Sequence, residues 1–235
     1  KLYQLLYKYI ITVPTSPKHS LSECNKENLI YFLYEKYVEY SKQSFFNLIL
    51  GNTELYCAGL RIIIENYVVL ANIVNSSDNV WKKFYLRSFS SAIGLLRTND
   101  KINLGRVIFG FENLKNEYNL SGENFSESYF NYDWLSDENN KIKSFKDACY
   151  LIDDCIYKNF RLLSNYSHCN SFVFKLSKFD YSLLNYALIH SSYLSKAVKL
   201  LNLETNIEYR NAEKKLFNYI FLLNESNPFN TFVAS

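Results

Sequence analysis

Residues 53–75, TELYCAGLRIIIENYVVLANIVN, make up the most apolar long stretch of the sequence. Apolar side chains occupy nearly every position around a helix of this length, so we expect the most buried helix of the protein here. Its most apolar part, residues 60–74, carries Arg61 and Glu65 and is shorter than the roughly 20 residues that a membrane-spanning helix needs. The stretch therefore predicts the core helix of a soluble protein with no membrane partner.

The composition of the 235-residue chain favours a folded, cytoplasmic protein. Hydrophobic residues make up 48% and aromatic residues 17%, which is typical of globular chains and not of disordered ones. The 6 glycines and 3 prolines are too few for the frequent turns of a β-sandwich or barrel. A net charge of +3 is too small to indicate nucleic acid or a membrane surface as a partner. Five cysteines without a C-x-x-C spacing indicate reduced thiols.

Helical periodicity continues on both sides of the central stretch, and it predicts an all-α protein that forms a single domain over residues 1–235. Residues 121–141 are the exception, because they lack periodicity and are rich in Ser, Asn and acidic residues. They predict a long irregular connection, either a domain boundary or an ordered excursion around Trp134. Beyond the central stretch, helices are expected over residues 1–13, 25–50, 78–97, 100–119, 144–168, 177–201 and 206–224, with capping boxes at "SFKD" (144) and "SKFD" (177).

Four polar residues share one face near the end of the expected helix 144–168. Arg161, Ser164, Asn165 and His168 follow the spacing i, i+3, i+4 and i+7. Arg161 offers a permanently charged fork suited to phosphate, and His168 exchanges a proton near neutral pH. Together they have the chemistry for cleaving a phosphodiester by attack of a neighbouring 2′-hydroxyl. The structural alternative is a histidine that interacts with the last carbonyls of its helix and an arginine in a surface ion pair.

A second polar pair, Arg61 and Glu65, lies four residues apart within the most apolar helix. One interpretation is a core ion pair that ties two helices together, since charges at such positions must be paired. The other is that one of the two side chains projects toward the face of Arg161 and His168 and orients His168. His190 follows the spacing of apolar residues of its own helix, so we expect a core histidine there and not a ligand.

The two patterns resemble a bacterial family of unknown function that belongs to the HEPN superfamily of all-helical proteins. They are R-x3-E, read here as Arg61-III-Glu65, and [F/Y]-x2-L-S-x3-H, read here as Phe160-RL-Leu163-Ser164-NYS-His168. The sequence "YDWLS" at residues 132–136 also resembles that family. The similarity covers roughly residues 28–200, so the resemblance implies a HEPN-like helical bundle with additional helices.

The resemblance also implies a function. HEPN proteins typically dimerise, and many are metal-independent endoribonucleases that act as toxins or in phage defence. By this resemblance Arg161, His168 and Glu65 are the catalytic residues, with Arg61, Ser164 and Asn165 in supporting positions. The expectation is a homodimer that acts on RNA without a metal or cofactor, with an antitoxin or defence-system protein as a further partner. The alternative is a non-catalytic ligand- or partner-binding module with a structural Arg–Glu–His cluster.

Overall fold

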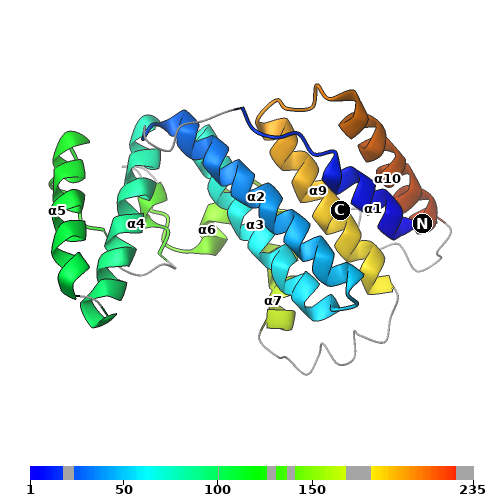
Figure 1. The fold of residues 1–235 in the computed structure, drawn as a ribbon, viewed down its shortest axis with the longest axis horizontal. Coiled ribbons are helices and arrows are strands. Elements are labelled where there is room, and N and C mark those ends of the chain that lie inside the picture. The colour runs from blue at the N-terminus through cyan, green and yellow to red at the C-terminus, as the bar shows by residue number, and fades with distance from the viewer. Residues whose placement is uncertain (18–23, 100, 126–130, 137–140, 168–180, 226–235) are drawn as a thin grey trace. The chain divides into compact units, whose positions relative to one another are not determined.

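A computed structural model describes residues 1–17, 24–99, 101–125, 131–136, 141–167 and 181–225, and these residues form nine α-helices, one 3-10 helix and no strand (Figure 1). The prediction of an all-α protein is confirmed. In chain order the elements are α1 (Leu2–Ile11), α2 (Lys26–Ile49), α3 (Thr53–Asn75), α4 (Asp78–Asn99), α5 (Lys101–Glu117), η1 (Asp133–Leu135), α6 (Phe145–Tyr150), α7 (Asp154–Ser167), α9 (Tyr181–Leu200) and α10 (Ile207–Glu225).

The chain divides into two compact units. The first unit comprises Lys1–Leu70 and Lys158–Ser235, and the second comprises Ala71–Tyr157. Two compact units are compatible with one domain of two lobes as well as with two domains, so the single domain over residues 1–235 stays a prediction.

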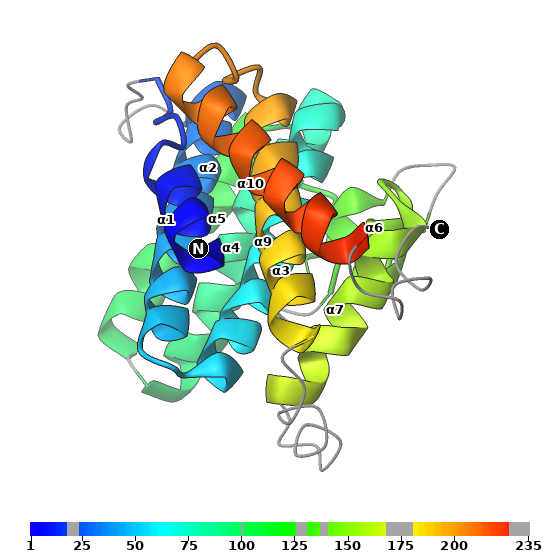
Figure 2. The ribbon, with the colours of Figure 1, turned by 90° about the vertical axis from the view of Figure 1, so that its right-hand side faces the viewer.

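The first unit contains α1, α2, α9, α10 and the parts of α3 and α7 that fall within its bounds. Figures 1 and 2 show α1 beside α10, with α9 next to both, and α2 packs on α1 and α9. Helix α1 buries Leu6, Tyr9 and Ile10, which lie three and four residues apart on one face. This face packs on the core of the unit, and the opposite face of α1 is exposed to solvent.

Helix α3 supplies much of the core of the first unit. Its residues Tyr56, Leu60, Ile63 and Ile64 are at most 1% exposed, in agreement with the expected buried helix. It lies close to α2 because residue 59 is a glycine. A Cβ atom added there would lie 2.9 Å from the Cβ atom of Ser44 on α2, so a larger residue would push the two helices apart.

Helix α3 is also longer than the apolar run that marks it in the sequence. Its 23 residues include an 18-residue window apolar enough to cross a membrane, and 56% of that window is buried inside the protein. Burial of this kind is typical of the core helix of a soluble protein, and length alone does not distinguish the two cases. The absence of a membrane partner and the cytoplasmic location stay predictions.

The second unit is an aromatic assembly around the hairpin of α4 and α5. Trp134, in η1, is 1% exposed, and its ring centroid lies 4.8 Å from that of Phe84 on α4. Ser136 Oγ accepts from the backbone N–H of Ile142 at 2.8 Å and donates to the carbonyl of the same residue at 3.0 Å. The described residues of the predicted connection 121–141 thus form an ordered excursion around Trp134.

The single helix expected from residue 144 to 168 is wrong, because α6 ends at Tyr150 and α7 begins at Asp154. The capping box at the start of α6 is confirmed, with Ser144 accepting from the backbone N–H of Asp147 and the Asp147 side chain bonding back. The break follows from Asp153, whose carboxylate accepts from the backbone N–H of Cys155 at 2.8 Å. This side-chain bond caps a new helix and competes with continuation of the old one. The box expected at residue 177 lies outside the described residues.

Candidate functional site

The last turns of α7 carry the described part of the second motif. Arg161 is exposed, Leu163 is fully buried, and Ser164 is half-buried. The alternation places the Leu163 side chain in the core of the first unit and leaves the guanidinium of Arg161 in solvent. Ser164 Oγ donates to the carbonyl oxygen of Phe160 at 2.8 Å, one helical turn earlier. His168 and the side chain of Asn165 lie outside the described part of the chain.

The first motif lies on α3 and contacts the second. Arg61 Nη2 donates to Glu65 Oε1 at 3.4 Å, and the two side chains are 22% and 33% exposed. The guanidinium of Arg61 also lies over the ring of Phe160, 4.8 Å from its centroid. A cation over an aromatic face is attracted by the ring quadrupole. Arg61 therefore links Glu65 on its own helix to the first residue of the motif on α7. Arg61, Glu65, Phe160, Arg161 and Ser164 are called the motif cluster below.

The carboxyl group of Glu65 is electrostatically the most unusual member of the motif cluster. Burial raises the pKa of Glu65, and the neighbouring Arg61 only partly opposes this rise. The contact between the two charges is long, at 3.4 Å, so the attraction recovers less than the lost hydration costs. A carboxyl group whose pKa moves toward neutrality is suited to proton transfer.

His190 is the core histidine that the sequence predicts. It is 0% exposed, its Nε2 lies 2.5 Å from Ser41 Oγ, and its Nδ1 lies 3.2 Å from the hydroxyl of Tyr56. Burial lowers the pKa of His190 to about 3, because the charged form has lost its hydration. The imidazole is therefore neutral near pH 7. Ser41, Tyr56 and His190 are called the His190 cluster below.

A further polar network in the first unit was not found from the sequence. The hydroxyls of Tyr9 and Tyr209 share a hydrogen bond of 2.9 Å. Tyr209 and Ser195 both donate to Glu213 Oε1, at 3.2 and 2.5 Å. The available signal was the position of Glu213 in α10, since it follows Tyr209 by four residues on a face that is otherwise apolar. The network links α1, α9 and α10. Because the buried polar atoms are hydrogen-bonded to one another, their burial costs little free energy.

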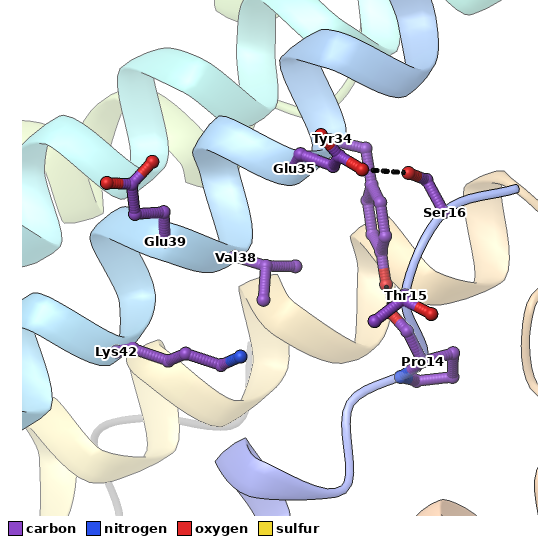
Figure 3. Close-up of a pocket in the computed structure, with 8 residues that line it drawn as sticks. All are labelled: Pro14, Thr15, Ser16, Tyr34, Glu35, Val38, Glu39 and Lys42. Carbon is purple, nitrogen blue, oxygen red and sulfur yellow. Dashed lines mark hydrogen bonds between the residues drawn. The ribbon is translucent and has the colours of Figure 1, made fainter. Parts of the chain in front are cut away.

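A pocket with a volume of about 260 Å³ lies between the segment 14–16 and α2 (Figure 3). Ser16 Oγ donates to Glu35 Oε1 at 2.8 Å, and the Tyr34 hydroxyl donates to the carbonyl of Pro14 at 2.8 Å. The pocket is smaller than most ligand sites. One of its walls comes from a segment without helical periodicity, so no pattern in the sequence indicated it. It is lined by Pro14, Thr15, Ser16, Tyr34, Glu35, Val38, Glu39 and Lys42.

Among the described residues, no group of three or more His, Cys, Asp and Glu side chains is placed to hold a metal ion. No protein-family model, curated protein or solved structure matches the chain. The resemblance to HEPN proteins therefore rests on the sequence motifs alone and stays a prediction.

Proposed function

We propose that the protein is a HEPN-like, metal-independent endoribonuclease that works in the cytoplasm as a toxin or phage-defence effector. The observation that carries the proposal is the contact of Arg61 with Phe160. The two motifs are far apart in the sequence, yet the first residue of each meets the first residue of the other. Chance matches to two short patterns do not require such a contact.

In the proposed reaction, Arg161 holds the phosphate, because its guanidinium is exposed and permanently charged. A base removes the proton of the 2′-hydroxyl, the 2′-oxygen attacks the phosphorus, and the bond to the 5′-oxygen breaks. The leaving 5′-oxygen takes up a proton, and a 2′,3′-cyclic phosphate remains on the upstream fragment. His168 and Glu65 are the proton-transfer groups, and Ser164, Asn165 and Arg61 position the RNA and these groups.

A non-catalytic binding module is the second candidate, and three observations favour it. The guanidinium of Arg61 is already engaged by Glu65 and Phe160. Ser164 Oγ is bonded to the backbone of its own helix. Residue 162 is a leucine, 37% exposed, where the HEPN nuclease motif usually has a polar residue. In this candidate the motif cluster stabilises the fold, and a ligand or partner protein is bound instead of cleaved.

The test is cleavage of single-stranded RNA by the purified protein in EDTA, with the fragment ends identified. We expect a 2′,3′-cyclic phosphate end. His168→Ala should slow cleavage by about 100- to 10,000-fold, since it removes a proton-transfer group. Arg161→Ala should also slow it, and Arg161→Lys should restore only part of the rate. Arg210→Ala, which removes another exposed arginine of the first unit, is the matched control and should leave the rate unchanged. Equal cleavage by His168→Ala and the original protein would exclude the nuclease and leave the binding module.

A further inference from the structure

Lys158 lies on the exposed face of α7 that also carries Arg161. It precedes Arg161 by three residues, and both side chains are exposed. Residues with this spacing are neighbours on a helix, with Cβ atoms about 5 to 6 Å apart, which is close to the distance between successive phosphates of a nucleic-acid strand. In the described part of the chain, neither side chain forms an ion pair. Two cations at this spacing can bind two successive phosphates.

A third cation lies next to α7, on α9. Asn159, the residue after Lys158, donates its side-chain amide to the hydroxyl of Tyr193 at 3.4 Å, and this bond joins α7 to α9 (Figure 2). The ammonium group of Lys196 lies over the ring of the same tyrosine, 5.3 Å from its centroid. Tyr193 is 2% exposed, whereas Lys196 is exposed. The buried tyrosine therefore holds the Lys196 side chain close to the side of α7 that carries Asn159.

We propose that Arg161, Lys158 and Lys196 form a track for the backbone of a single RNA strand. All three belong to the first unit. Arg161 holds the phosphate at which cleavage occurs, and the two lysines bind flanking phosphates as point charges. The inference rests on the proposed function, and it narrows the substrate to a strand with at least three phosphates. Because phosphate contacts carry no sequence information, the track binds RNA without a preference for particular bases.

The test is the salt dependence of RNA binding by the full chain. The probe is a fluorescein-labelled 2′-O-methyl decauridylate, which lacks the attacking 2′-hydroxyl, and binding is followed by fluorescence anisotropy between about 50 and 200 mM KCl. Each phosphate contact with a single strand contributes about −0.7 to the slope of the logarithm of the binding constant against the logarithm of salt concentration. Lys158→Gln and Lys196→Gln should each weaken binding and make this slope less negative by about 0.7, and the double variant by about 1.4.

Matched variants separate the charges from effects on folding. Lys158→Arg and Lys196→Arg keep a cation at each position and should keep the original slope. Lys8→Gln removes an exposed lysine from α1, which lies across α9 from α7 (Figures 1 and 2), and should leave the slope unchanged. Melting curves confirm that all variants fold. Titration of unmodified RNA with the His168→Ala chain should give the same slopes, which excludes an effect of the methyl groups.

The outcomes distinguish the track from the nuclease. Absence of RNA binding at about 50 mM KCl, or a slope that either glutamine variant leaves equal to that of Lys8→Gln, would overturn the track. Cleavage of unmodified RNA in EDTA tests the nuclease separately. Binding that depends on both lysines without cleavage would retain the track and exclude the nuclease, whereas cleavage with unchanged slopes would exclude the track and retain the nuclease.

Discussion

The His190 cluster and the motif cluster lie in the same compact unit, and both place polar side chains next to apolar ones. Every member of the His190 cluster is fully buried, and the two hydrogen bonds of the His190 ring join side chains of different helices. In the motif cluster Arg161 is exposed, Arg61 and Glu65 are part-exposed, and Ser164 bonds to its own helix.

The comparison shows that fully buried polar groups matter for stability, whereas part-exposed ones can take part in chemistry. Removing a side chain from the His190 cluster leaves partners in a region that water does not reach, which is costly. Removing one from the motif cluster leaves partners that water can solvate. His190, which is held by buried hydrogen bonds, is neutral near pH 7, whereas Arg161 is exposed.

The largest effect on stability is expected from His190→Ala. The change leaves Ser41 and Tyr56 without their buried partner and opens a cavity, so it should lower the free energy of unfolding by about 3 kcal/mol. Urea denaturation measures this, with Arg210→Ala as a surface control within about 0.5 kcal/mol. A loss below about 1 kcal/mol would mean that the His190 cluster does not stabilise the fold in the way the hydrogen bonds indicate.

The pH dependence of stability tests the same residue in the intact protein. The pKa of His190 is lowered to about 3 in the folded state, whereas the unfolded chain has a histidine pKa near about 6.5. The contribution of neutral His190 to the free energy of unfolding is therefore complete above about pH 6.5. It is lost as the pH falls toward 3, by about 1.4 kcal/mol per pH unit. The free energy of unfolding of His190→Gln should lack this dependence on pH when it is measured by denaturation at pH 6.5, 5.5 and 4.5. Equal slopes in the two proteins would contradict the assignment.

The sequence predicted the helices and the core histidine because both depend on local spacing. The segments α2, α3, α4 and α10 carry apolar residues at helical period, and their ends fall close to the expected ones. The end of α9 at Leu200 also lies close to the expected residue 201, whereas the expected start at residue 177 lies outside the described residues. His190 was placed by the same periodicity. The capping box at Ser144 was found because it depends on residues three positions apart.

The sequence failed where distant or competing contacts decide. The interruption between α6 and α7 arises because the Asp153 side chain caps a new helix inside a continuous helical pattern. The network of Tyr9, Tyr209 and Glu213 depends on how α1 and α10 meet, which no single-helix pattern contains. Arg61 contacts Phe160, the first residue of the second motif, whereas the expected approach of Arg61 or Glu65 to His168 lies outside the described residues and stays a prediction. The roles of these residues in catalysis stay predictions.

Glu65 is expected to have a smaller effect on the pH dependence of stability, opposite in sign to that of His190. Burial raises its pKa in the folded state, so the protonated form is favoured there and the wild-type protein loses stability as the pH rises above about 4.3. Glu65→Gln does not titrate and keeps a hydrogen-bond acceptor for Arg61. Its stability relative to wild type should therefore increase between pH 4 and 7, by less than about 1 kcal/mol because the pair is part-exposed. Parallel pH profiles of the two proteins would show that desolvation of Glu65 is unimportant.

The smallest effect is expected at Ser164, and it separates the two clusters most directly. Its hydroxyl donates to the carbonyl of Phe160, which already belongs to the backbone ladder of α7, and such bonds slightly disfavour a helix. Ser164→Ala should therefore change the free energy of unfolding by less than about 0.5 kcal/mol. Ser41→Ala, the matched change in the His190 cluster, should cost about 1 to 3 kcal/mol, because it leaves a buried imidazole nitrogen unpaired. If both serines are equally dispensable in urea denaturation, burial does not distinguish the clusters. If Ser164→Ala is the costlier change, the motif cluster is a structural element and the binding module gains support.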